Sequence, residues 1–556
     1  MNDRRRPVVH THRRVRCGPL RPKVRWLRWA CLSLAAAVAL PMVVIASGWL
    51  SVDSTVWRHL ADTVLLGLLR NTAVLVIGVG GGVLVLGVGL AWLTVMCEFP
   101  GRKVFDWALM LPLAIPAYVL AFIAVGLLDF SGPIQGWLRG LLGPDGYWFP
   151  PIRSEGGVIA VMVLVLYPYV YMLTRAAFLG QGRSSLEAAR VLGLGPWAAF
   201  FRVAIPGARP AIVAGIALAL METLADFGAV AVFNYDTFTT AIYKAWFGLF
   251  NLDAAAQLAS LLLLLVGAGL FGEHLARGRA RYHSVGSAGQ RWRLTLRGSR
   301  AALACGFCSL VLGLAFLVPV GQLLGWAWSH VVLDLDRRYW SMLGHTLTLG
   351  AGAAAMTVAG AVVLSVTKRN HGDRSVRLGV RIATLGYALP GSVLAVGIMI
   401  SLAWADTLFA NLLKWFGADV GPLLQGTVVA LLIAYVVRFL AVGFGPVDSA
   451  LERVRPSLVE AARALGARPI EILARVYLPI LRSGLLTAML LIMVDVMKEM
   501  PATLLLRPFG WDTLAVRIFE MTSEGEWERA ALPALTLVLT GLFPVILLVQ
   551  RSGSTR

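Results

Sequence analysis

The sequence contains little charge and no polar stretch long enough to fold as a separate domain. Of its 556 residues, 14% are charged and 58% are hydrophobic, and the mean hydropathy is +0.74. A soluble chain of this length needs a far more polar surface, so the composition indicates a membrane protein. The net charge of +20 does not indicate nucleic-acid binding, because the basic residues lie in short segments between apolar runs.

Sequence motifs of enzymes are also missing. The chain has no Gly-Lys dipeptide and therefore no GxxxxGK[ST] phosphate-binding loop. Its eight histidines include no HExxH pair and its serines no GxSxG, which argues against a membrane enzyme. Cys305 and Cys308 have CxxC spacing but lie in an apolar run without a second pair, so we assign no metal site. We expect no catalytic residue and no cofactor in this chain.

Apolar runs, in contrast, are abundant, and twelve of them are long enough to cross a bilayer, which takes about 20 helical residues. Backbone polar groups must be satisfied inside lipid, so the sequence predicts an all-α polytopic membrane protein. The first run is too long for the core of a typical signal peptide, so we expect an uncleaved span. The expected spans are 27–50, 66–96, 105–128, 156–178, 209–233, 252–272, 301–328, 343–366, 380–404, 423–444, 482–505 and 529–550.

Lysine and arginine are concentrated on one side of this arrangement. The arginine-rich start of the chain is expected in the cytoplasm, since cytoplasmic segments carry an excess of basic residues. With twelve spans, the C-terminus and the loops around 187 and 460 then lie on the same side. The two opposite loops 129–156 and 234–251 hold few basic residues, whereas the cytoplasmic loops hold Arg277, Arg279, Arg281, Arg291, Arg293, Arg297, Lys368, Arg369, Arg374, Arg377 and Arg381.

The chain is an internal duplication. A shift of 273 positions pairs Glu187 with Glu460 and Gly193 with Gly466, and a shift of 274 pairs Pro116 with Pro390. Six spans per half is an even number, so the two halves should have the same orientation, as a parallel repeat. The expected division is a basic N-terminal segment 1–26, a first six-span domain 27–272, a basic cytoplasmic linker 273–300, a second six-span domain 301–550 and a cytoplasmic tail 551–556.

The best-matched repeat is a charged loop, EAARVLGLGPWAAFFRVAIP at 187–206 and EAARALGARPIEILARVYLP at 460–479. Glu-Ala-Ala-Arg favours a helix, the glycine ends it, and the proline suits the first turn of a second helix. Such a helix–turn–helix outside the bilayer is either an interfacial helix on lipid or a docking surface. Its occurrence in both halves favours a partner that binds twice. The candidate docking residues are Glu187, Ala188, Ala189, Gly193, Pro196, Glu460, Ala461, Ala462, Gly466 and Pro469.

Both loops resemble the EAA motif of the permease subunits of binding-protein-dependent ABC importers. The resemblance runs through both halves and implies the type I importer permease fold in a bacterial cytoplasmic (inner) membrane. It implies that each loop couples to one of two ATPase copies, and that ATP and Mg are bound by that partner rather than by this chain. It also implies a separate substrate-binding protein as partner and no nucleic acid.

Ionisable residues follow each loop within an apolar segment. Glu222 and Asp226 are four residues apart, as are Asp495 and Glu499, and the shift of 273 relates the two pairs. On a continuous helix each pair shares one face. Charges in spans are costly and usually face a cavity or a partner, so these four residues and Lys498 are candidates for a translocation path. Inter-helix hydrogen bonding that holds the halves together is an equal alternative. Lys498 is expected to pair with Glu499 or Asp495.

The cargo is suggested by the same stretches. ETLADFG, TFTTAIY and KEMPATLLLRPFGWDTLA resemble the ferric-iron branch of the permease family, and carboxylate oxygens suit a hard trivalent cation. Permeases for thiamine, phosphonate or polyamine share the EAA loop and remain alternatives for the cargo. A secondary transporter driven by an ion gradient is a further alternative, although such a carrier needs no duplicated ATPase dock.

Overall fold

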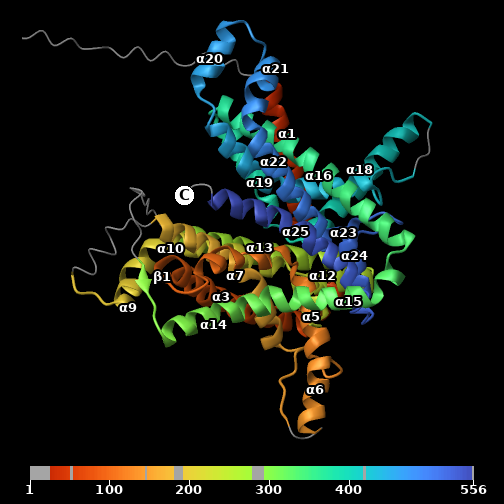
Figure 1. The fold of residues 1–556 in the computed structure, drawn as a ribbon. Helices are drawn as coiled ribbons and strands as arrows, with labels where there is room; N and C mark the ends of the chain where they lie inside the picture. The colour runs from red at the N-terminus through yellow and green to blue at the C-terminus, as the bar shows by residue number, and fades with distance from the viewer. Residues whose placement is uncertain are drawn as a thin grey trace, which may run out of the picture.

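The computed structural model describes residues 25–50, 54–143, 147–180, 192–277, 293–417 and 421–553. These form a helical protein (Figure 1), together with one short parallel pairing of β1 (Cys97–Glu98) and β2 (Leu294–Thr295). Glu98 forms ion pairs with Arg102 at 3.2 Å and with Arg293 at 3.0 Å. The end of the linker is therefore attached to the first half.

The first half begins with two long helical segments and contains several short helices between its spans. Its elements are α1 (Arg25–Ser47), α2 (Ser54–Leu60), η1 (Ala61–Leu65), α3 (Leu66–Met96), α4 (Arg102–Ala108), η2 (Leu111–Ala114), α5 (Ala117–Leu128), α6 (Pro133–Leu142), α7 (Glu155–Gly180), α9 (Pro196–Ala199), η3 (Phe200–Ala204), α10 (Ile205–Ala225), α11 (Gly228–Val232), α12 (Phe238–Tyr243), η4 (Lys244–Gly248) and α13 (Leu252–Arg277).

The second half repeats this order. Its elements are α14 (Ser299–Leu312), η5 (Gly313–Leu317), α15 (Val318–Asp334), α16 (Arg337–Asn370), α17 (Arg374–Ala383), η6 (Gly386–Ala388), α18 (Gly391–Trp415), α19 (Val428–Glu452), α20 (Pro456–Ala464), α21 (Pro469–Ile472), η7 (Leu473–Tyr477), α22 (Leu478–Lys498), α23 (Pro501–Leu506), α24 (Leu514–Ser523) and α25 (Ala531–Gly553).

Among the described residues, eleven helical segments are long and apolar enough to cross a membrane, and the apolar segment Ala531–Ile546 of α25 is shorter. All twelve expected spans have a helical counterpart, but four of them are not the continuous helices that were expected. The third and ninth are interrupted before Pro116 and Pro390, which lie at the starts of α5 and α18. The fifth and eleventh end at Ala225 and Lys498, and a separate short helix follows each.

The duplication is visible in the backbone. η3 and η7 are both five-residue π-helical turns, and they are related by the shift of 273. Gly193 and Gly466, at equivalent positions before them, both have φ +81°. An L residue with a side chain rarely adopts this left-handed conformation, so glycine is required at both turns.

The first span of each half packs against the opposite half. α1 lies against α16, α17 and α18, and its residues Cys31, Ala35 and Val38 belong to the hydrophobic core of the second half. Conversely, Ala304 and Cys308 of α14 belong to the core of the first half, and α15 lies against α5. Because each half completes the core of the other, the two halves cannot separate without exposing apolar surface.

A buried ion pair fixes α4 to α7 in the first half. Arg175 binds both carboxylate oxygens of Asp106 at 2.7 Å, and the two side chains are 14% and 10% exposed. Tyr171 donates to the backbone carbonyl of Asp106 at 2.9 Å. A two-pronged arginine–carboxylate contact with little exposure to solvent is among the stronger charge interactions available to a protein.

Replacing Arg175 with methionine should therefore destabilise the protein by about 3 kcal/mol, because it removes the two-pronged ion pair from a buried carboxylate. Thermal unfolding of the purified protein in detergent measures this. The control is Arg70→Met, which removes the exposed ion pair with Glu155 between α3 and α7 and should change stability by less than about 1 kcal/mol. Equal melting temperatures for both variants would contradict the prediction.

Candidate functional site

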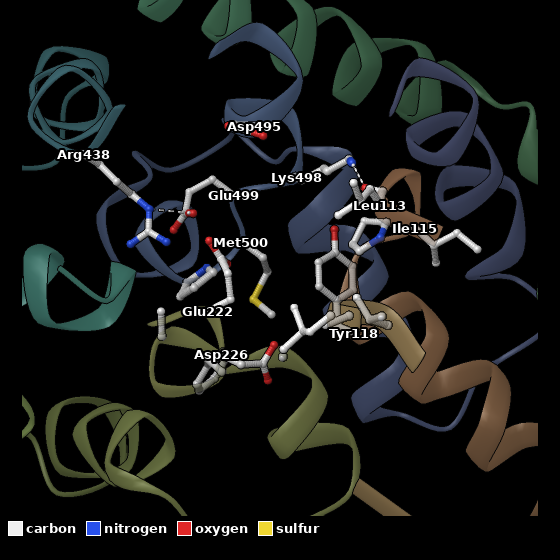
Figure 2. A pocket seen from close by; sticks show the side chains of 18 of the residues that line it. Leu113, Ile115, Tyr118, Glu222, Asp226, Arg438, Asp495, Lys498, Glu499 and Met500 are labelled. Atoms are coloured by element: carbon white, nitrogen blue, oxygen red, sulfur yellow. Dashed lines mark hydrogen bonds and ion pairs between the residues drawn. The ribbon is translucent and has the colours of Figure 1, made fainter. Parts of the chain in front are cut away.

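A cavity of about 180 Å³ lies at the interface between the two halves. All five residues predicted to lie on the path line it: Glu222, Asp226, Asp495, Lys498 and Glu499. Figure 2 shows that Glu222 and Asp226 reach it from the first half, whereas the other three come from the second half. The repeat thus brings its two acidic pairs together at one place within the membrane-spanning region.

The two acids of each pair do line the same cavity, but the second acid lies just past the end of the helix that carries the first. α10 and α22 end just before Asp226 and Glu499, which both have extended backbones. Asp226 accepts the backbone N–H groups of Ala229 at 3.0 Å and Val230 at 3.1 Å, at the start of α11. Glu499 accepts that of Ala502 at 3.2 Å, at the start of α23. The second acid of each pair therefore satisfies backbone donors of the next helix.

Arg438 is the counterion of Glu499. Its Nε lies 3.1 Å from the Glu499 carboxylate, both side chains are less than 10% exposed, and Arg438 also donates to the carbonyl of Leu389 at 2.6 Å. Both interactions link α19 to the chain around α18 and α23. The expected pairing of Lys498 with Glu499 or Asp495 is absent from the described ion pairs.

Two hydrogen bonds cross the cavity from one half to the other. Tyr387 of the second half donates to the Glu222 carboxylate at 2.8 Å. Lys498 donates to the backbone carbonyl of Leu113 at 3.1 Å, as Figure 2 shows. In the described part of the chain, Asp495 makes no hydrogen bond or ion pair. Hydrogen bonds that join the halves and a polar lining thus occur at the same site, and Asp495 lines the cavity without a described hydrogen bond or ion pair.

The cavity is less symmetric than the acidic pairs suggest. The positions equivalent to Arg438 and Lys498 in the first half are Val165 and Ala225, so both cations come from the second half. Arg438 was missed in the sequence, although a lone arginine within the apolar run 423–444 was a usable signal. Tyr387 carried no comparable signal, because a tyrosine near the end of a span is common.

The second coupling loop is described in full. α20 carries Glu460, Ala461 and Ala462 and ends in a turn at Gly466, where the N–H of Gly466 binds the carbonyl of Arg463 and that of Ala467 binds the carbonyl of Ala462. This pair of bonds is a Schellman motif. α21 then begins at Pro469.

In the first loop, α9 begins at Pro196, which follows Gly193, whereas Glu187, Ala188 and Ala189 lie outside the described residues. The described parts of the two loops follow the same order of glycine turn, proline and π-helical turn. In Figure 1, α9 and α20–α21 lie at separate ends of the molecule. The two repeated loops are therefore apart from one another in space.

Two helical repeats around a charged interfacial cavity, each with a glycine turn followed by a proline and a π-helical turn, define a membrane translocation protein. The chain belongs to the family described as binding-protein-dependent transport system inner membrane component, which it matches over residues 83–277 and 353–552. It is thus an integral inner-membrane protein and the permease component of a binding-protein-dependent ABC importer.

Relatives with different cargoes resemble the chain. It is 29% identical over 487 residues to the Fe(3+)-transport system permease protein FbpB 2 of Haemophilus influenzae, covering 86% of this chain and 89% of the relative. It is 27% identical to the sulfate transport system permease protein CysW of Escherichia coli, covering 38% of this chain and 72% of the relative. It is 35% identical to the molybdenum transport system permease protein ModB of Escherichia coli, covering 26% of this chain and 62% of the relative.

A double-mutant cycle separates a structural from a transport role at Glu499. Arg438→Met alone should destabilise the protein by about 3 kcal/mol, because it leaves a buried carboxylate unpaired. Arg438→Met combined with Glu499→Gln should recover most of that loss but should not restore transport. Thermal unfolding and uptake measured on the same preparations test this; recovery of both stability and transport in the double variant would assign the pair to structure alone.

Proposed function

We propose that this permease carries ferric iron through the cavity between its two halves. The observation that carries the proposal is the charge of that cavity: four carboxylates line it against two basic side chains. Both basic groups already have protein partners, Arg438 with Glu499 and Lys498 with the Leu113 carbonyl. The lining therefore favours a hard cation, which prefers oxygen ligands, over an oxyanion.

The arrangement of the cavity carboxylates suits the passage of a metal ion better than its tight binding. In the described part of the chain, no three His, Cys, Asp or Glu side chains lie together as a metal-binding group. Glu222 and Asp226 stand on one side of the cavity and Asp495 on the other (Figure 2). Conduction requires sites that attract an ion without holding it tightly, so separated carboxylates are better suited than a chelating cluster.

The energy for transport is proposed to come from two copies of a separate ATPase subunit, which binds ATP and Mg. Each copy would dock on one coupling loop, and a substrate-binding protein would deliver the cargo at the opposite end. The shared φ of +81° at Gly193 and Gly466 supports equivalent docking elements in the two halves. An oxyanion cargo is the second candidate, because relatives named for sulfate and molybdenum resemble parts of the chain.

Gly466→Pro should uncouple transport from ATP hydrolysis. Proline fixes φ near −65° and has no N–H, so it fits neither the φ of +81° nor the hydrogen bond to Arg463. ATP-driven uptake should fall to background while the permease stays in the membrane, and Gly193→Pro should act alike. The control is Gly372→Pro, at an ordinary negative φ between α16 and α17. Full uptake and normal ATPase assembly in both loop variants would overturn the docking assignment.

Cargo is tested in proteoliposomes containing the permease, its ATPase and its binding protein, with labelled Fe(III), sulfate and molybdate supplied separately. We expect ATP-dependent uptake of Fe(III) alone. Asp495→Asn keeps the side-chain shape but removes the cavity carboxylate that has no described hydrogen bond or ion pair, and should lower Fe(III) uptake roughly tenfold, the effect of about 1.4 kcal/mol. Asp226→Asn and Glu499→Gln should lower it further, because both also weaken a helix start.

The matched control is Asp253→Asn, an exposed carboxylate on α13 that does not line the cavity, which should leave uptake unchanged. Sulfate or molybdate uptake in place of iron would keep the importer assignment and discard the iron cargo. Uptake that persists without the ATPase would instead indicate a gradient-driven carrier.

A further inference from the structure

A second cavity, of about 480 Å³, lies beside the second coupling loop. Its walls are the start of α1, the end of α16 and the segment from α20 to η7. The lining is mainly apolar, with two arginines and an asparagine: Trp26, Leu27, Val362, Val363, Val366, Asn370, Arg463, Ala467, Arg468, Ile470, Ile472, Leu473 and Tyr477. The cavity shares no lining residue with the one between the halves.

The corresponding place in the first half is filled by aromatic rings. Trp92 packs on Phe200 with ring centroids 4.7 Å apart, and Trp197 packs on Phe200 at 6.2 Å. The repeat shifts of 274 in the second span and 273 in the loop place Val366, Leu473 and Ile470 at these positions. All three line the cavity. The cavity therefore arises because the second half has smaller aliphatic residues where the first half has aromatic residues.

Its position is at the end of two membrane spans. α1 and α16 are both long and apolar enough to cross the bilayer, and Trp26, at the cavity mouth, is 60% exposed. Tryptophan is enriched where spans meet the membrane–water boundary. By this argument the apolar interior would lie at the depth of acyl chains and the mouth at the depth of headgroups.

The charge at the mouth is positive. Neither guanidinium, of Arg463 or of Arg468, takes part in a described ion pair or hydrogen bond. The nearby carboxylate of Glu471 is used locally, since it accepts the backbone N–H of Arg468 at 2.8 Å. Basic pockets between spans at the membrane surface bind anionic lipid headgroups. We propose that this cavity binds one anionic phospholipid, with an acyl chain against Val366 and Leu473 and the phosphate near Arg463 and Arg468.

Two other occupants are less well matched. Residues 1–24 precede α1 directly, but they contain eight Lys and Arg against one Asp, and a basic segment is repelled by the two arginines. A soluble partner docked on α20 would meet the mouth at Arg463, but its side chain would have to pass the two arginines to reach the apolar interior at Val366 and Leu473. A lipid is present at that depth already and needs no such displacement.

The test uses the full-length protein in nanodiscs of phosphatidylglycerol or phosphatidylcholine, with retained lipid counted by native mass spectrometry after release into detergent. The wild type should retain one phosphatidylglycerol and no phosphatidylcholine. Arg463→Gln with Arg468→Gln should weaken retention about fivefold for each arginine removed. Leu473→Phe introduces the residue found at the equivalent position of the first half and should exclude the acyl chain with both arginines intact.

The matched control is Arg377→Gln with Arg381→Gln, which removes two exposed arginines of α17 outside the cavity and should leave retention unchanged. Equal retention in every variant, or equal retention of both lipids, would overturn the proposal. Stronger lipid retention after deletion of residues 1–24 would also overturn the proposal, because that segment would then be the occupant. Loss of the lipid once the ATPase is bound would overturn it as well, because the partner would then be the occupant. The measurement needs no cargo and is independent of the iron assignment.

Discussion

The arrangement of the site depends on two helices that end inside the membrane-spanning region. Where α10 and α22 end, backbone N–H groups of the next short helix need acceptors, and lipid supplies none. Asp226 and Glu499 provide those acceptors at equivalent positions. Carboxylates are held in the interior by this requirement, and the loss of regular helix there lets side chains from both halves line one cavity. The charged lining and the broken helices are therefore parts of the same arrangement.

Because the helix ends and the charged lining are linked, a structural role of the acidic residues is compatible with a role in the translocation path. Asp226 and Glu499 stabilise helix starts, and Tyr387 ties Glu222 to the opposite half; these are structural contacts. The same contacts fix the carboxylates at the interface, where a cation crossing between the halves would meet them. Asp495 differs from the other three, because it makes no hydrogen bond or ion pair with the residues that the structure describes, and its role is the least explained by structure.

The sequence predicted the duplication, the glycine turns at Gly193 and Gly466 and the gathering of five ionisable residues, since each left a local or periodic signal. It did not predict the helix ends at Asp226 and Glu499, because acids four residues apart look the same on a continuous helix and at its end. The exchange of α1 and α14 between halves left no signal either. Both are apolar spans, and composition does not say which neighbour an apolar span will choose.

Fusion of the two halves into one chain gives each copy of the repeat freedom to change separately. The backbone has kept its symmetry in the glycine turns, the π-helical turns and the capped helix starts. The side chains have not: the second half alone supplies Arg438 and Lys498 to the central cavity, and it alone has aliphatic residues where the first half has Trp92 and Phe200. Because the main chain must satisfy its hydrogen bonds in both halves, the turns and the capped helix starts remain symmetric. The two basic side chains of the central cavity and the lining of the second cavity are under no such constraint and differ between the halves.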